Sequence, residues 1–199
     1  MNCDHVVKLA AASHCSAPAL LVLEDVKGST LTQYLSQRDH RHELWAKFLQ
    51  AAKGLQYLRY SQRTVHGNLK PANILVDSSG TVKVTDFGRG IATLQNLAVH
   101  SGGGDQVMQW RAPEYRSPDL RPTYRGDVYS LGLCMLDALV GNFTPPTTEP
   151  PARPTKISDE GWALVERMCE SDPADRIEID GVVGVLEQLA QHPMQHLGL

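Results

Sequence analysis

The chain has 199 residues, of which 42% are hydrophobic and 21% are charged, and its formal net charge is −3. This size and composition are typical of one globular domain with a sizeable core, and the small net charge favours neither a nucleic-acid nor a membrane-surface partner. No run approaches the length of about 18 apolar residues that a membrane helix needs. The start lacks the basic flank and apolar run of a signal peptide, so a cytoplasmic protein is expected.

The first 26 residues contain two short apolar segments, Val6–Leu9 and Leu20–Leu23, which predict two paired strands. An isolated two-stranded hairpin is at best marginally stable in water. An exposed apolar strand edge also invites pairing with another chain. We therefore expect self-association or a protein partner through residues 6–26, unless this segment frays.

Most of the remaining chain predicts helices. A short helix is expected over residues 30–37, and a longer one over 43–60, where apolar side chains recur on a single face. Residues 127–141 are apolar nearly all round, which is typical of a helix at the centre of a helical domain. Ser158 and Asp180 are predicted to cap the last two helices.

Two further strands are predicted over residues 74–76 and 81–84, joined by a turn at Asp77–Gly80. Residues 101–104 predict a mobile loop because they are rich in glycine. Residues 144–154 contain five prolines and therefore cannot form a helix.

Three short motifs follow one another in the middle of the chain. They are His66–Val76 (HGNLKPANILV), Asp86-Phe87-Gly88 and Ala112-Pro113-Glu114. Their order and spacing resemble the H-R-D-L-x-x-x-N, D-F-G and A-P-E motifs of protein kinases. The resemblance implies an α+β, protein-kinase-like fold. Residues 27–199 would form the mostly helical large lobe, and residues 1–26 a two-strand remnant of the small lobe with the hinge.

The same resemblance implies ATP and Mg²⁺ as cofactors and assigns candidate site residues. Asn73 and Asp86 match the metal ligands, whose oxygen atoms suit Mg²⁺. Lys70 matches the lysine that lies near the transferred phosphate. The alternative interpretation is a solvated surface lysine. The adenine side of the site would consist of Leu23, Glu24, Val26 and Leu75, the last of which is equally readable as a core leucine.

Several positions depart from the family pattern. Asn68 stands where the family has its catalytic Asp, and an amide cannot accept the proton of a substrate hydroxyl. Loss of a general base typically lowers the rate by about 10²–10⁴. Gly67 replaces the family arginine, and Gln106-Val107 occupies the place of a Gly-Thr pair. The Gly-rich loop and the ATP-clamping lysine of the V-A-I-K motif do not occur in these 199 residues.

The leading hypothesis is a pseudokinase-like interaction module with weak or absent nucleotide binding. The alternatives are a working Ser/Thr kinase whose sequence is incomplete here, and a decayed fragment. Trp110 before the A-P-E motif, together with Leu69-Lys70-Pro71, is most similar to the tyrosine-kinase-like group of Ser/Thr kinases. In the family, an arginine pairs with the A-P-E glutamate, so Glu114 and Arg176 are expected to form an ion pair.

Overall fold

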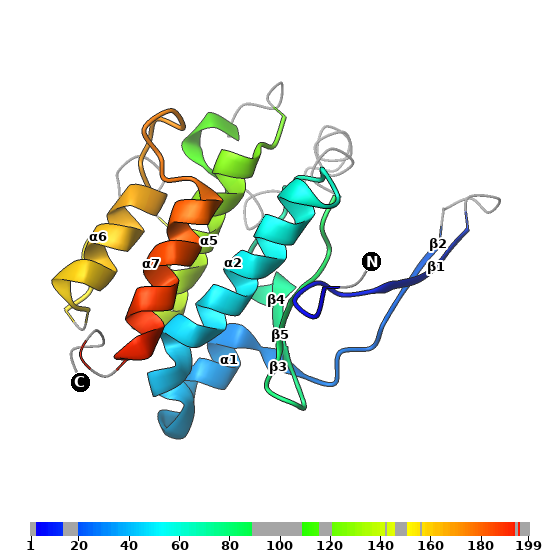
Figure 1. Cartoon of the computed structure of the whole chain (residues 1–199), viewed down its shortest axis with the longest axis horizontal. Helices are drawn as coiled ribbons and strands as arrows, with labels where there is room; N and C mark the ends of the chain where they lie inside the picture. The colour runs from blue at the N-terminus through cyan, green and yellow to red at the C-terminus, as the bar shows by residue number, and fades with distance from the viewer. Residues whose placement is uncertain are drawn as a thin grey trace.

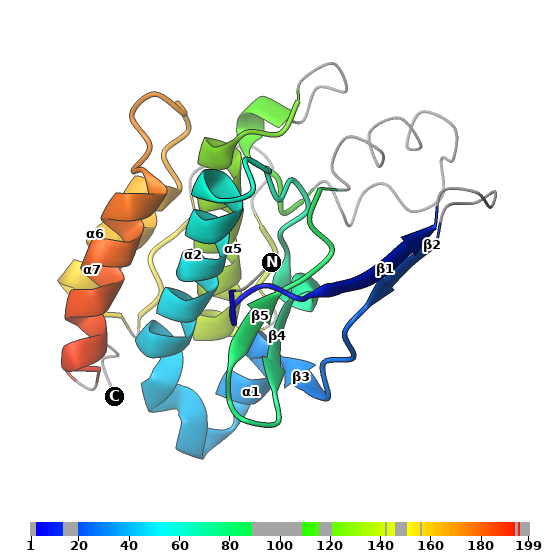
Figure 2. The ribbon, with the colours of Figure 1, turned by 45° about the vertical axis from the view of Figure 1, so that its right-hand side comes forward.

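The computed structural model describes residues 3–13, 20–88, 109–115, 121–141, 143–145, 151–155, 157–193 and 195. Four helices lie side by side: α2 (Leu44–Tyr60), α5 (Tyr124–Val140), α6 (Asp159–Met168) and α7 (Ile179–Gln191) (Figure 1). A small antiparallel sheet flanks α2, and a separate hairpin extends away from the body (Figure 2). The predicted loop at 101–104 and the Gln106-Val107 pair lie outside the described residues.

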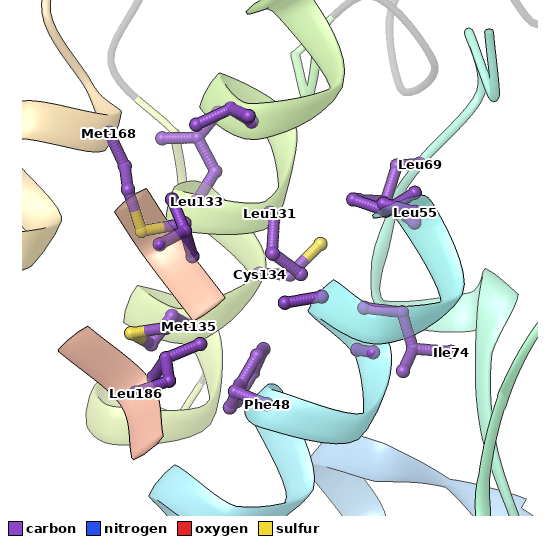
Figure 3. Packing of buried hydrophobic residues seen from close by; sticks show 14 of the residues in the cluster. Phe48, Leu55, Leu69, Ile74, Leu131, Leu133, Cys134, Met135, Met168 and Leu186 are labelled. Atoms are coloured by element: carbon purple, nitrogen blue, oxygen red, sulfur yellow. The ribbon is translucent and has the colours of Figure 1, made fainter. Parts of the chain in front are cut away.

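Helix α5 forms the centre of the molecule, as its nearly uniform apolar surface predicts. Every residue from Gly126 to Leu139 is buried, and α5 packs against α2, α6, α7 and the short helix α1 (Leu31–Ser36). Figure 3 shows Leu133 beside Met168 of α6, and Cys134 pointing toward α2 on the opposite side. A helix surrounded in this way is a rigid base for any residue that it anchors.

The other helices form largely where their patterns predict. Thr30 and Gln33 form a capping box at the start of α1, and a 3₁₀ helix over Arg38–Glu43 leads into α2. Ser158 caps α6 as predicted, because its hydroxyl accepts the Gly161 backbone N–H. The prediction for Asp180 is wrong. The N-cap position of α7 is Glu178, whose side chain makes no capping hydrogen bond. The carboxylate of Asp180, in the first turn, accepts hydrogen bonds from α2.

The flanking sheet has the order β3 (Gly28–Thr30), β4 (Ile74–Asp77) and β5 (Val82–Val84). The predicted turn between β4 and β5 is confirmed, because the Asp77 carboxylate accepts two backbone N–H groups of the turn. Strand β3 has no apolar pattern that predicts it. At Gly28, a Cβ atom would lie 1.8 Å from the carbonyl oxygen of Val76, so only glycine allows this close approach.

The amino-terminal hairpin differs from its prediction. Its strands are β1 (Leu9–Ser13) and β2 (Leu20–Leu23), so the first strand begins where the predicted one ends. Val6 and Val7 instead lie beside β5, where Val7 N donates to the Val84 carbonyl at 3.0 Å. Both valines are buried, because this segment covers apolar surface of β5 and α2.

Strands β1 and β2 stand apart from the helices (Figures 1 and 2). Strands β1 and β2 contact chiefly each other among the described elements. The hairpin side chains Leu9, Val22 and Leu23 are among the most exposed large hydrophobic residues that the structure describes. We refer to β1 and β2 as the arm.

Candidate active site

The loop between α2 and β4 is anchored to the core by Asp127 of α5. The two carboxylate oxygens of Asp127 accept the backbone N–H groups of His66 and Gly67, at 2.7 and 2.8 Å. Burial raises the pKa of Asp127 to about 7, although these two hydrogen bonds act in the opposite direction. Gly67 has a φ of 70°, in the left-handed region that favours glycine, so the replacement of the family arginine suits the local backbone.

His66 lies fully buried beneath this loop. Its Nδ1 accepts the Asn68 backbone N–H at 3.3 Å, which places the proton of the neutral ring on Nε2. Its carbonyl accepts the Gly88 N–H at 3.0 Å, and its ring meets the Phe87 ring edge-on. Burial lowers the pKa of His66 to about 4, so the ring is neutral at physiological pH. These contacts join the predicted catalytic loop to the Asp86-Phe87-Gly88 segment.

Asn68, Asn73 and Asp86 come together at the end of the β4–β5 pair. The Asn68 side-chain amide donates to Oδ2 of Asp86 at 2.7 Å, and the Asn73 amide donates to the Asn68 carbonyl at 2.7 Å. Asp86 has a φ of 60°, which is uncommon for a residue with a side chain. The sequence therefore identified three residues that the tertiary structure joins, with Asn68 hydrogen-bonded to both Asp86 and Asn73.

The donor set fits a Mg²⁺ ion in part. Asp86 supplies a carboxylate, and Asn73 retains a side-chain carbonyl oxygen because its NH₂ group is already bonded. Mg²⁺ commonly takes only one or two protein ligands and completes its shell with water and phosphate oxygens. Within the described residues, no group of three His, Cys, Asp or Glu side chains forms a metal cluster.

Lys70 and Asn68 line a small hollow on the face of the loop that looks toward Arg111. The hollow is closed by Tyr115, Asp127 and Ser130. Arg111 is buried, and burial lowers its pKa. Sequence reasoning missed Arg111; its only signal is a charged residue between Trp110 and Ala112, next to the A-P-E motif. The hollow thus has two cationic side chains and an amide at the position of the family's base. Among the described residues that line the hollow, Asp127 is the one carboxylate, and it is already bonded to the backbone.

The predicted adenine-side residues lie around the start of β3 and on β4. Glu24 forms an ion pair with Lys83 of β5 at 2.7 Å, and Lys83 lies opposite Leu75 in the β4–β5 register. This pair holds the predicted hinge against β5, the strand next to the one that carries Leu75. Leu23 is 39% exposed, while Val26 and Leu75 are half-buried. The structure therefore links Glu24 to the sheet that carries Leu75, while Leu23 at the end of β2 is left exposed.

The predicted pair between Glu114 and Arg176 is confirmed. Arg176 Nη1 and Nη2 donate to the two carboxylate oxygens of Glu114, at 2.7 and 3.0 Å. This bidentate pair holds the A-P-E segment against the connection between α6 and α7.

Comparison with known proteins agrees with these features. Residues 1–194 match the family described as protein kinase domain. The chain is 31% identical to the mitogen-activated protein kinase kinase SIPKK of Nicotiana tabacum over 85% of its residues, which covers 45% of that protein. It is 33% identical to the proline-rich receptor-like protein kinase PERK15 of Arabidopsis thaliana over 80% of its residues and 32% of that protein.

A third relative, mitogen-activated protein kinase kinase 1 of Arabidopsis thaliana, is 27% identical over 88% of the chain and 55% of its own length. The chain therefore spans about half or less of these relatives. No helix among the described residues is long and apolar enough to cross a membrane. The motifs, the anchored loop, the Glu114–Arg176 pair and the match over nearly the whole chain lead to one conclusion: this chain belongs to the protein kinase family.

Proposed function

We propose that the chain is a protein-kinase-like domain that does not transfer phosphate at a useful rate and acts through protein contacts. One observation carries the proposal. The side chain at the position of the catalytic base is the Asn68 amide, and it donates its hydrogen to Asp86. An amide is not basic enough to take the proton of a substrate hydroxyl, in contrast to the carboxylate that the family has at this position.

The residues around Asn68 also support the absence of phosphate transfer. Lys70 and Arg111 line the hollow beside Asn68, so an incoming hydroxyl would meet cations and an amide. Both oxygens of Asp127, the carboxylate in the hollow, accept backbone N–H groups. In the family, ATP and Mg²⁺ supply the phosphoryl group and its charge neutralisation. Asn73 and Asp86 are the residues of this chain that would hold the metal.

A phosphorylation assay with radiolabelled ATP and generic protein substrates tests the proposal. The chain is compared with its Asp86→Ala and Asn68→Asp variants. We expect no labelling by the parent above Asp86→Ala. Asn68→Asp is expected to stay inactive as well, because these 199 residues contain no V-A-I-K lysine to clamp the phosphates. Labelling by the parent that disappears in Asp86→Ala would overturn the proposal.

A second candidate is a working Ser/Thr kinase of which these residues form one part. The retention of Lys70, Asn73 and Asp86 favours it, as does the coverage of about half the length of the relatives. Strong activity of a longer natural chain that retains Asn68 would support this candidate against the first.

We also propose the tyrosine-kinase-like group as the closest subgroup. Trp110 before Arg111-Ala112-Pro113-Glu114 and the Leu69-Lys70-Pro71 sequence support it. The relatives include mitogen-activated protein kinase kinases and receptor-like kinases at similar identity, so they do not separate the subgroups.

The surface that we propose for protein contact is the arm. Leu9 is 42% exposed, Val22 is 44% exposed and Leu23 is 39% exposed, and all three lie on a two-stranded sheet that stands apart from the body (Figure 2). Two-stranded sheets gain stability when further strands are added. Pairing of two arms edge to edge would make a four-stranded sheet and cover these side chains, so we propose self-association through the arm.

A further inference from the structure

The amide of Asn68 is bonded to one of the two carboxylate oxygens of Asp86, a candidate metal ligand. Nδ2 of Asn68 lies 2.7 Å from Oδ2 of Asp86. An ionised carboxylate can only accept hydrogen bonds, so the atom that faces it must be the NH₂ group and not the carbonyl of the amide. Hydrogen bonds to a charged acceptor are among the stronger ones in proteins.

Asn68 also controls the second candidate ligand. Its backbone carbonyl accepts the Asn73 NH₂ group at 2.7 Å, and Asn73 is buried with 7% of its surface exposed. The Asn73 carbonyl oxygen is therefore the atom left for a cation. Both candidate ligands are thus joined through Asn68, one to its side chain and the other to its main chain.

We infer that Asn68 acts as a built-in substitute for a cation at Asp86 and lowers the affinity of this site for divalent metal ions. A divalent ion that approaches Oδ2 of Asp86 from the side of the amide displaces this N–H group, and the lost hydrogen bond is subtracted from the binding free energy. An aspartate at position 68 would have the opposite effect, because two neighbouring carboxylates repel each other until a cation lies between them.

The inference concerns the same site as the proposed function, but it does not depend on the loss of phosphate transfer. A chain that transferred phosphate would overturn the proposed function and leave the metal affinity to be measured. Metal binding without nucleotide separates the two questions.

The experiment is a titration with Mn²⁺ alone, in which electron paramagnetic resonance reports the free ion at constant pH. The parent is compared with Asn68→Ala, Asn68→Asp and Asp86→Asn. We expect Asn68→Ala to bind about tenfold more tightly than the parent, which corresponds to about 1.4 kcal/mol. Asn68→Asp should bind more tightly still, and Asp86→Asn should lose the site.

A matched control exists on the other side of α2. Gln56 Nε2 donates to Oδ1 of Asp180 at 2.8 Å, which is the same type of amide–carboxylate hydrogen bond on an exposed surface. Gln56→Ala should therefore bind Mn²⁺ like the parent. Circular dichroism and thermal unfolding establish that each variant is folded. Asn68→Leu replaces Asn68→Ala if the latter does not fold, since it removes the NH₂ group, keeps a similar shape and adds no donor.

Two results would overturn the inference. Equal affinity of Asn68→Ala and the parent would show that the amide does not compete with the ion. Weaker binding by Asn68→Ala would show that Asn68 turns its carbonyl oxygen to the metal and acts as a ligand.

Discussion

Arg176 holds Glu114 through two hydrogen bonds from a fully buried guanidinium group. The guanidinium carbon lies 5.0 Å from the centre of the Tyr129 ring on α5. The same group donates to three main-chain carbonyls, those of Arg125, Glu170 and Ser171. The buried charge is therefore well satisfied, and it joins the A-P-E segment, the central helix and the α6–α7 connection.

Replacement of Arg176 by Met should be strongly destabilising. It leaves the Glu114 carboxylate and three carbonyls without their donor, and breaking a buried pair from one side typically costs about 3–5 kcal/mol. The exposed pair of Arg153 and Asp159 provides the control, because Arg153→Met should cost less than about 1 kcal/mol. Urea unfolding monitored by circular dichroism measures both. Equal losses for the two variants would contradict the structural role of Arg176.

Gly54 of α2 should not tolerate a side chain. A Cβ atom there would lie 2.5 Å from the carbonyl oxygen of His5, so the segment that carries Val6 and Val7 would have to move. We expect Gly54→Ala to lower stability by about 1–3 kcal/mol. Gly184 of α7 is exposed with no atom near its Cβ position, so Gly184→Ala should instead stabilise by about 0.5–1 kcal/mol. Thermal unfolding of both variants checks the sign of each effect.

His66 should make the folded state sensitive to acid. Burial lowers the pKa of His66 from 6.5 to about 4. As the pH falls through 6.5, His66 becomes protonated in the unfolded chain. In the folded chain it becomes protonated only near pH 4. The contribution of His66 is therefore fully present above pH 6.5 and is lost toward pH 4. At about 1.4 kcal/mol for each unit of pKa, the loss amounts to about 3 kcal/mol.

Asp127 acts in the opposite direction over the same range. Its pKa is raised from 3.8 to about 7, so the folded chain binds a proton that the unfolded chain has released, and stability rises as the pH falls. The parent should consequently show little net pH dependence from these two groups. His66→Gln should gain stability relative to the parent between pH 7.5 and pH 4, whereas His42→Gln, at an exposed position, should not. Parallel urea midpoints for parent and His66→Gln across this range would be inconsistent with a buried neutral His66.

Nucleotide should bind weakly. The predicted adenine-side residue Leu23 is 39% exposed, and one carboxylate oxygen of Asp86 is bonded to Asn68. We expect the dissociation constant for Mg-ATP to exceed about 1 mM, which corresponds to about −4 kcal/mol or weaker. Calorimetric titration measures it. Micromolar affinity would mean that a partner or a second copy of the chain covers the exposed adenine side of the site.

The arm should associate with a second copy. Val22→Lys places a charge on the exposed face of β2 and should shift the chain toward a monomer in light scattering over a dilution series. The control is Val140→Lys at the end of α5, a position that is 53% exposed and lies outside the arm. Point substitution is preferable to removal of residues 1–26, because the latter also deletes Val6 and Val7 from the core. A parent that stays monomeric at all concentrations rules out self-association through the arm.

The sequence alone determined the family and most of the helices. Apolar periodicity and capping residues act within a few positions of one another, so the central helix and the Ser158 cap could be predicted from short windows. The same holds for the candidate residues Asn68, Lys70, Asn73 and Asp86, because motif order along the chain identifies them without any distance in space.

Only the tertiary structure decided how these residues interact. Asn68 and Asp86 are separated along the chain, and no local sequence pattern predicts that the Asn68 amide donates to the Asp86 carboxylate. Val6 and Val7 could be predicted as apolar but not as partners of β5 rather than of β2, since strand pairing depends on long-range packing. Strand β3 and the buried Arg111 escaped prediction for the same reason: their environment is made by segments that are distant in sequence and meet only in the folded chain.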